Sequence, residues 1–111
     1  MSPTARTLKY LKDKGLPCQV VEHFNHWAKV RNDLFGFIDI LALDLENKQC
    51  VGIQVTTASN KSNRIKKILA SPLLHAVKGC GIKVEVHAWK KISKKECALS
   101  RKHWGVSIDV I

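Results

Sequence analysis

Three polar residues, Asp39, Gln54 and Thr56, lie in two otherwise apolar stretches of the sequence, "FIDILAL" and "VGIQVT". A hairpin turn centred at residues 46–47 pairs Asp39 directly with Gln54, and Thr56 lies further along on the same face. A carboxylate facing an amide oxygen suits a hard divalent cation such as Mg²⁺. The alternative is a hydrogen bond between Asp39 and Gln54 inside the sheet, without a metal.

Two strands, 33–44 and 49–57, must position these residues. Both faces of the first strand are apolar apart from Asp39, which is typical of a central strand. Alternation places its side chains on opposite faces: Phe37, Asp39, Leu41 and Leu43 on one, and Ile38, Ile40 and Ala42 on the other. In the second strand, one face carries Val51, Ile53 and Val55, and the other face is polar.

Apolar periodicity and cap residues predict the remaining elements. They are a helix from Ser2 and Pro3 to about Gly15, a strand at 18–24, a loop at 25–33, a helix at 59–70, a short helix at 72–79, a strand at 82–89 and a last strand at 105–111. Ser59 or Ser62 caps the second helix, whose apolar side is Ile65, Ile68 and Leu69. This order predicts an α/β fold with a mixed sheet flanked by helices.

Composition sets the class of protein. A chain of 111 residues with 45% hydrophobic residues is expected to form a single globular domain, 1–111. It has no apolar run of about 18 residues for a membrane helix, and its cysteines are too far apart for a paired zinc motif. We expect a cytoplasmic protein, in a bacterium or a phage-infected host.

The net charge of +10 favours a polyanionic partner. An anionic membrane surface and simple solubility are the alternatives. The basic residues are spread over "KSNRIKK", "WKKISKK" and "SRKHW", which indicates a charged surface of the folded domain. Trp27, Trp89 and Trp104 can either stack on bases or pack against the core.

The carboxylate of one hairpin strand, followed by "QVT" in the next, resembles the motif of the PD-(D/E)XK nuclease superfamily. That superfamily includes Holliday-junction resolvases, VRR-type nucleases, many restriction enzymes and small phage and bacterial nuclease-like proteins. Its core has the order α-β-β-β-α-β, and the resemblance spans roughly Thr4 to Lys91. It implies a restriction-endonuclease-like fold and allows a homodimer.

The resemblance also implies roles for single residues. Asp39 matches the metal-binding aspartate, Gln54 the (D/E) position, and Val55 would offer its backbone carbonyl to the metal. Glu22 is a candidate third ligand, and Asp33 is either an outer ligand or a turn residue. The implied cofactor is Mg²⁺ or Mn²⁺.

Thr56 departs from the motif, because it stands where the family has its catalytic lysine. Arg64 and Lys67, three residues apart on the following helix, can replace that lysine or contact phosphate. The candidate DNA-binding residues are Lys61, Arg64, Lys66, Lys67, Lys90 and Lys91.

The sequence therefore predicts a metal-dependent DNA endonuclease that hydrolyses phosphodiester bonds, in particular those of branched or recombination intermediates. A catalytically inactive relative that binds nucleic acid or a partner protein is the first alternative, favoured by Thr56. A basic protein-interaction domain, such as a small phage accessory factor, is the second.

Overall fold

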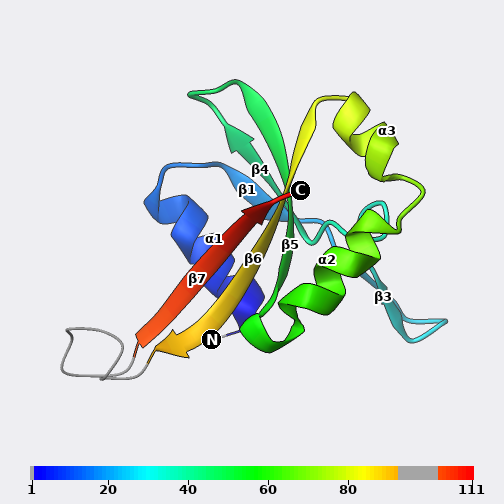
Figure 1. The fold of residues 1–111 in the computed structure, drawn as a ribbon, viewed down its shortest axis with the longest axis horizontal. Coiled ribbons are helices and arrows are strands. Elements are labelled where there is room, and N and C mark those ends of the chain that lie inside the picture. Colours follow the sequence, from blue (N-terminus) through cyan, green and yellow to red (C-terminus); the bar gives the residue numbers. More distant parts are fainter. Residues whose placement is uncertain (1, 93–102) are drawn as a thin grey trace.

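A computed structural model describes residues 2–92 and 103–111, and only the backbone of residues 24, 31 and 103. Its elements, in chain order, are α1 (Pro3–Asp13), β1 (Cys18–Val20), β2 (His23–Asn25), β3 (Val30–Asn32), β4 (Ile40–Asp44), β5 (Gln49–Thr57), the 3₁₀ helix η1 (Ala58–Asn60), α2 (Lys61–Leu69), α3 (Leu74–Gly79), β6 (Ile82–Ile92) and β7 (His103–Val110) (Figure 1). The basic residues of "SKK" and "SRK" at 93–95 and 100–102 lie outside the described residues.

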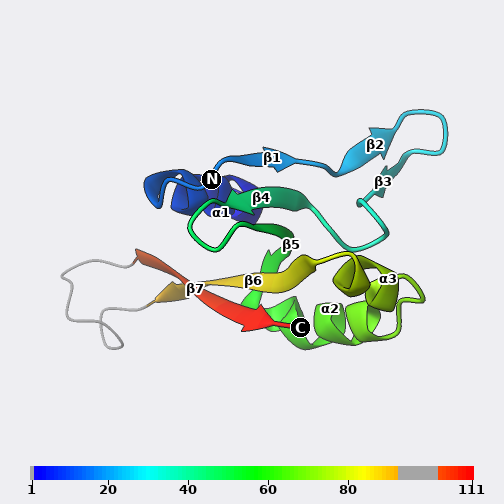
Figure 2. The same cartoon turned by 90° about the horizontal axis from the view of Figure 1, so that it is seen from above.

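A five-stranded mixed sheet in the order β1-β4-β5-β6-β7 forms the centre of the protein, and β2 and β3 form a separate two-stranded sheet. Helix α1 covers one face of the large sheet, and α2 and α3 cover the other (Figure 2). Each interface has its own apolar cluster, around Ile40 and Ile53 on the α1 face and around Ile68 and Val86 on the α2 face. The predicted α/β class, with helices on both faces of a mixed sheet, is confirmed.

The β4–β5 hairpin has the predicted register. Ile40 pairs with Ile53 and Asp44 pairs with Gln49, so the turn is centred at residues 46–47. Asp44 holds this turn through bonds that Asn47 donates, from its backbone N to Oδ1 (3.1 Å) and from Nδ2 to Oδ2 (2.8 Å). β5 and β6 are parallel, joined by the crossover through α2 and α3.

The first helix begins as predicted. The Ser2 hydroxyl accepts a hydrogen bond from the backbone N of Ala5 (3.1 Å), and Pro3 occupies the first turn. The second helix does not use either predicted cap, because Asn60 is its N-cap residue and makes no side-chain cap bond. Leu69 was expected on the apolar side but is 60% exposed.

The segment 18–33 differs most from the prediction. The strand expected at 18–24 ends at Val20, and the expected loop at 25–33 contains β3, which pairs with β2. The Asn25 side chain shapes the tight connection, since its Oδ1 accepts bonds from the backbone N of Trp27 (3.0 Å) and Ala28 (3.2 Å). The polar sequence of this hairpin concealed the pairing.

The strand expected at 33–44 begins only at Ile40. Phe35 (φ 56°) and Gly36 (φ 86°) form a left-handed turn, and the chain closes it with an isolated bridge between Leu34 and Ile38. Ile38 therefore joins Phe37 in the α2-side cluster, whereas Ile40 faces α1. The predicted alternation across residues 37–40 is wrong for this reason.

No helix among the described residues is both long and apolar enough to cross a membrane.

Gly52 provides the space into which the Ile38 side chain, just after the turn at Phe35 and Gly36, packs. A Cβ atom at Gly52 would lie 2.6 Å from Ile38 Cδ1 and 3.0 Å from Ile38 Cγ1. Ile38 is fully buried, so its side chain has little room to move. Gly52 thus lets the segment that carries Asp39 lie close against β5.

We expect Gly52→Ala to lower the free energy of unfolding by about 1–3 kcal/mol, because it overpacks this contact. Ile38→Val removes Cδ1 and should partly relieve the clash, so the double variant should lose less than the sum of the single losses. Urea unfolding measures all three, with Gly79→Ala as the control, since nothing lies within 4 Å of a Cβ there. Strictly additive losses would contradict this packing.

Candidate functional site

Asp39 lies just before β4, beside the middle of β5. Its backbone N donates to the Ile53 carbonyl (2.8 Å), which anchors the residue to the sheet. Its Oδ2 accepts hydrogen bonds from Gln54 Nε2 (2.6 Å) and from the backbone N of Val55 (2.8 Å). The structure therefore places Asp39 against Gln54, as the hairpin register predicts, and joins them by the hydrogen bond of the metal-free alternative.

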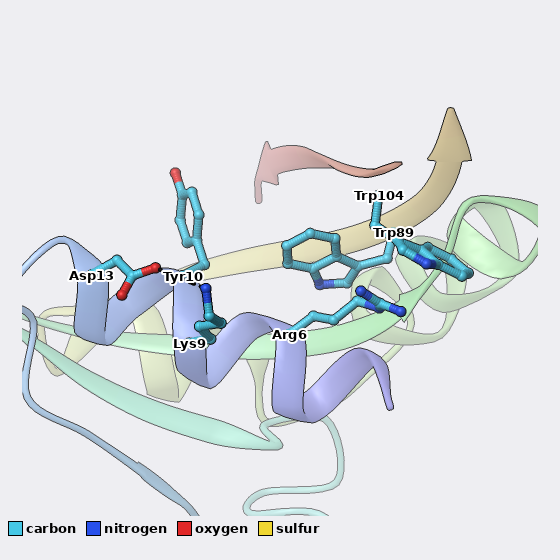
Figure 3. A pocket seen from close by; sticks show the side chains of 6 residues that line it. All are labelled: Arg6, Lys9, Tyr10, Asp13, Trp89 and Trp104. Carbon is cyan, nitrogen blue, oxygen red and sulfur yellow. Dashed lines mark ion pairs between the residues drawn. The ribbon is translucent and has the colours of Figure 1, made fainter. Parts of the chain in front are cut away.

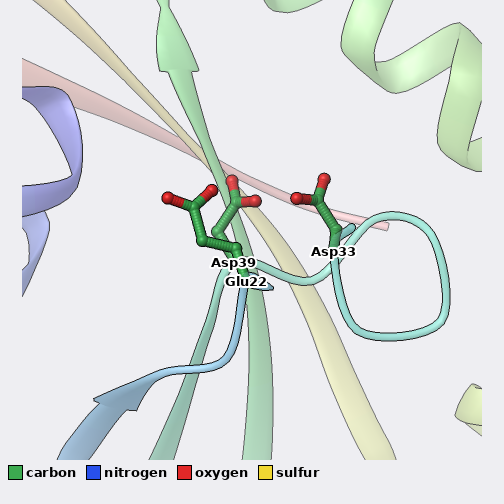
Figure 4. Close-up of side chains that lie close together, drawn as sticks. All are labelled: Glu22, Asp33 and Asp39. Atoms are coloured by element: carbon green, nitrogen blue, oxygen red, sulfur yellow. The ribbon is translucent and has the colours of Figure 1, made fainter. Parts of the chain in front are cut away.

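Glu22 and Asp33 lie beside Asp39. Each of the three residues offers a carboxylate oxygen, and these oxygens lie within 4.8 Å of one another. Figure 4 shows the three carboxyl groups pointing to the same side from three neighbouring segments. The structure thus brings together the three acidic residues that the sequence proposed as ligands.

The β2–β3 hairpin explains this meeting. His23 pairs with Asn32, so Glu22, just before β2, and Asp33, just after β3, flank the open end of the hairpin. The neighbouring Val21 donates from its backbone N to the Asp39 carbonyl (2.8 Å), which ties that end to the segment before β4. The β2–β3 hairpin, which was not predicted from the sequence, therefore positions two of the three carboxyl groups.

The electrostatics of Asp39 are unusual for an aspartate. Burial, followed by the neighbouring carboxyl groups of Asp33 and Glu22, raises its pKa to about 7 against the opposing effect of the Val55 N–H. Near neutral pH this carboxyl group therefore holds a proton much of the time. A cation placed among the three carboxyl groups would relieve their repulsion and displace that proton.

A pocket of about 300 Å³ opens over these groups. Its lining residues are Thr4, Glu22, Asp33, Asp39, Gln54, Val55, Arg64 and Lys67. Two cations from α2 thus share one pocket with three carboxyl groups, and Thr4 brings the beginning of α1 to its rim. Thr4 was not foreseen, because nothing in the sequence links α1 to this site.

Gln54 leaves one polar atom unsatisfied. Its Oε1 is buried and has no hydrogen-bond partner among the described residues, and the residue is only 2% exposed. A buried polar atom without a partner is destabilising. Rotation of the amide group would exchange Oε1 with Nε2 and turn the oxygen toward Asp39, an orientation that a cation between them would favour. The donor set fits a hard divalent cation.

The other predicted residues lie elsewhere. Thr56 is 6% exposed, and it is not among the described residues that line the pocket. Lys61 binds β7 instead, with its Nζ 3.0 Å from Asp109 Oδ2 and 2.8 Å from Ser107 Oγ. Lys66 is exposed on α2, about 100° around the helix axis from Lys67.

Lys90 and Lys91 are adjacent on β6 and so point to opposite faces of the sheet. Lys90 lines a shallow depression with Ala58 and Ser107, and Lys91 pairs with Trp104 of β7. The six basic residues therefore do not form one patch around the carboxyl groups, and only Arg64 and Lys67 line their pocket.

The chemistry of the pocket is that of a cation and a phosphate. Carboxylate and amide oxygens are ligands of Mg²⁺, and guanidinium and ammonium groups bind phosphate oxygens. None of the protein-family models, curated proteins or solved structures with which the chain was compared matches it.

The raised pKa of Asp39 predicts how stability depends on pH. Between about pH 4 and pH 7 the folded protein keeps a proton on Asp39 that the unfolded chain releases. The free energy of unfolding attributable to Asp39 should therefore fall as the pH rises through this window. Asp39→Asn does not titrate, so its stability relative to wild type should increase from pH 4.5 to pH 8.

Urea unfolding in the presence of a chelator measures this difference at each pH. Glu46→Gln, which removes an exposed carboxylate from the β4–β5 turn, is the control and should follow the wild type. A difference between Asp39→Asn and wild type that stays constant with pH would show that Asp39 titrates normally.

Proposed function

We propose that this chain is a metal-dependent endonuclease that hydrolyses phosphodiester bonds in DNA. One observation carries the proposal: the carboxyl groups of Glu22, Asp33 and Asp39 share a single pocket with the cationic side chains of Arg64 and Lys67. Anionic oxygens for a cation and cations for a phosphate are the two requirements of this reaction.

The topology supports the resemblance to the PD-(D/E)XK superfamily. Helix α1 precedes three antiparallel strands, β1, β4 and β5, and α2 leads to β6, which is parallel to β5. This is the α-β-β-β-α-β order of a restriction-endonuclease-like core. The inserted β2–β3 hairpin, α3 and β7 are additions to that order.

The acidic residues would hold the cation, Mg²⁺ or Mn²⁺. Glu22, Asp33 and Asp39 supply carboxylate oxygens, and the amide oxygen of Gln54 can join them after rotation. The Val55 carbonyl remains a further candidate ligand, since Val55 also lines the pocket. When bound, such a cation polarises the phosphate and lowers the pKa of a coordinated water.

The basic residues would orient the phosphate and stabilise the charge that develops on it. Arg64 and Lys67 reach the pocket from α2, whereas Thr56, at the position of the motif lysine, is buried. We assign the role of the missing lysine to this pair. Arg64 is the more enclosed of the two and offers a planar guanidinium group for two phosphate oxygens.

A second function, metal-independent binding of nucleic acid by an inactive relative, is favoured by one observation. Asp39 Oδ2 already accepts two hydrogen bonds without a metal, so the fold satisfies this carboxyl group by itself. Salt-sensitive DNA binding that a chelator leaves unchanged, together with absent cleavage, would support this alternative.

Cleavage assays with duplex, branched and single-stranded DNA test the proposal. With Mg²⁺ or Mn²⁺ we expect cleavage that EDTA abolishes and that Asp39→Asn reduces by about 100-fold or more, because a ligand oxygen is lost. Glu46→Gln should cleave like wild type. Folded wild-type protein that cuts none of these substrates with either metal would refute the proposed nuclease function.

The rate of cleavage should rise between about pH 6 and pH 8 as Asp39 loses its proton.

The same assay separates the pocket cations from the general basic charge. Arg64→Gln should lower the rate of cleavage at saturating DNA, because its positive charge acts on the bound phosphate. Lys66→Gln removes the same charge from the same helix outside the pocket, and should only weaken binding in a salt-dependent manner. Equal effects of the two variants on the rate at saturation would contradict the role of Arg64.

A further inference from the structure

A second pocket lies between α1 and the β6–β7 strand pair, on the face of the sheet that α1 covers. It has a volume of about 260 Å³ and is lined by Arg6, Lys9, Tyr10, Asp13, Trp89 and Trp104. Figure 3 shows these side chains around the open space. We call these six residues the aromatic groove.

The floor of the groove is rigid. Trp89 is 7% exposed, and its Nε1 donates to Thr7 Oγ1 (2.8 Å), a hydroxyl group that is itself completely buried. The Tyr10 ring packs edge-to-face against Trp89, with ring centroids 6.5 Å apart and planes at 82°. These contacts fix the Trp89 and Tyr10 rings before any ligand binds, which reduces the entropy lost on binding.

Trp104 is different, because it is 38% exposed although it lies next to this buried cluster. The Arg6 guanidinium carbon is 4.1 Å from the centroid of its ring. Such a contact is weak at an exposed site, so a planar ligand can displace Arg6 or stack where Arg6 does not cover the ring. The arrangement keeps an indole accessible beside a positive charge.

The charge of the groove is mainly positive. Arg6 and Lys9 come from α1, and Lys91 lies directly opposite Trp104 in the β6–β7 ladder and therefore on the same face. The single acidic residue among the lining residues, Asp13, forms an ion pair with Lys9 (3.6 Å). An aromatic platform with cations at its edge is the arrangement that binds single-stranded nucleic acid.

We propose that the aromatic groove binds unpaired nucleotides of the DNA substrate, with a base stacked on Trp104 and the phosphates held by Arg6, Lys9 and Lys91. Pockets for drug-sized ligands are about 300–1,000 Å³, so this smaller groove suits one base. Bases inside a continuous duplex are stacked on each other and unavailable, which makes unpaired nucleotides the matching partner.

The assignment of DNA as the ligand of the groove rests on the proposed nuclease function. The groove adds that this DNA substrate contains unpaired nucleotides. Thr4 lines the carboxylate pocket and Arg6 lines the groove; the two residues are about 3 Å apart along the axis of α1 but about 200° apart around it. The two sites therefore lie on different sides of the N-terminal half of α1. The substrate is then DNA that carries an unpaired segment, as at a branch or a flap.

Fluorescence anisotropy in EDTA tests the groove independently of cleavage. The probes are a thymidine oligonucleotide of about 12 nucleotides and an abasic oligonucleotide with the same number of phosphates. Trp104→Ala should weaken binding of the thymidine oligonucleotide by about 5- to 100-fold and leave binding of the abasic one nearly unchanged. Trp104→Phe, which keeps an aromatic ring, should retain most of the affinity and shows that the fold is intact.

Trp27→Ala is the matched control, because Trp27 is 98% exposed and lies in the turn between β2 and β3, outside the groove. It should bind both oligonucleotides like wild type. Unchanged binding by Trp104→Ala, or an equal loss on both oligonucleotides, would overturn the proposal even if wild-type protein cleaves DNA. Conversely, base-dependent binding through Trp104 without any metal-dependent cleavage would uphold the groove and refute the nuclease function.

Discussion

The burial of one carboxyl group, that of Asp39, is the constraint on which the candidate site depends. A charged carboxylate is stable in such a place only with hydrogen-bond donors or a cation beside it. Strand β5 provides the donors through Gln54 Nε2 and the Val55 N–H, and burial with two acidic neighbours raises the pKa of Asp39 to about 7. These contacts hold Asp39 in place without a metal. A divalent cation bound beside it would displace its proton and leave the carboxylate charged.

The surrounding fold is organised to bring other groups to this carboxyl. The left-handed turn at Phe35 and Gly36 and the space above Gly52 let the segment 34–39 pack against β5 instead of continuing as a strand. The β2–β3 hairpin adds the acidic residues at its open end, and α2 adds its cations to the same pocket. Acidic and basic side chains that are distant in sequence therefore meet in one pocket.

Local patterns in the sequence were enough to predict the mixed sheet, the hairpin register and the facing of Asp39 and Gln54, since element order, strand alternation and turn position fix those relations. They were not enough for the β2–β3 hairpin, whose short strands are mostly polar in sequence, or for Ile38, whose sheet face is set by the turn before it. The pairing of Lys61 with Asp109 of β7 was likewise not predicted from the sequence. Each of these features depends on a contact between segments that no local pattern encodes.

One pocket contains carboxyl groups and α2 cations, and the other contains tryptophans and α1 cations. In the nuclease function that we propose, the first would carry the chemistry and the second would recognise the DNA. The central proposal is that the pocket lined by Glu22, Asp33 and Asp39 binds a divalent cation. A crystal soaked in Mn²⁺ tests it directly through anomalous scattering. We predict a peak about 2.0–2.6 Å from oxygens of at least two of Glu22, Asp33 and Asp39, lost in Asp39→Asn. No peak in that pocket, with Asp39 still bonded to Gln54 and Val55, would contradict the account.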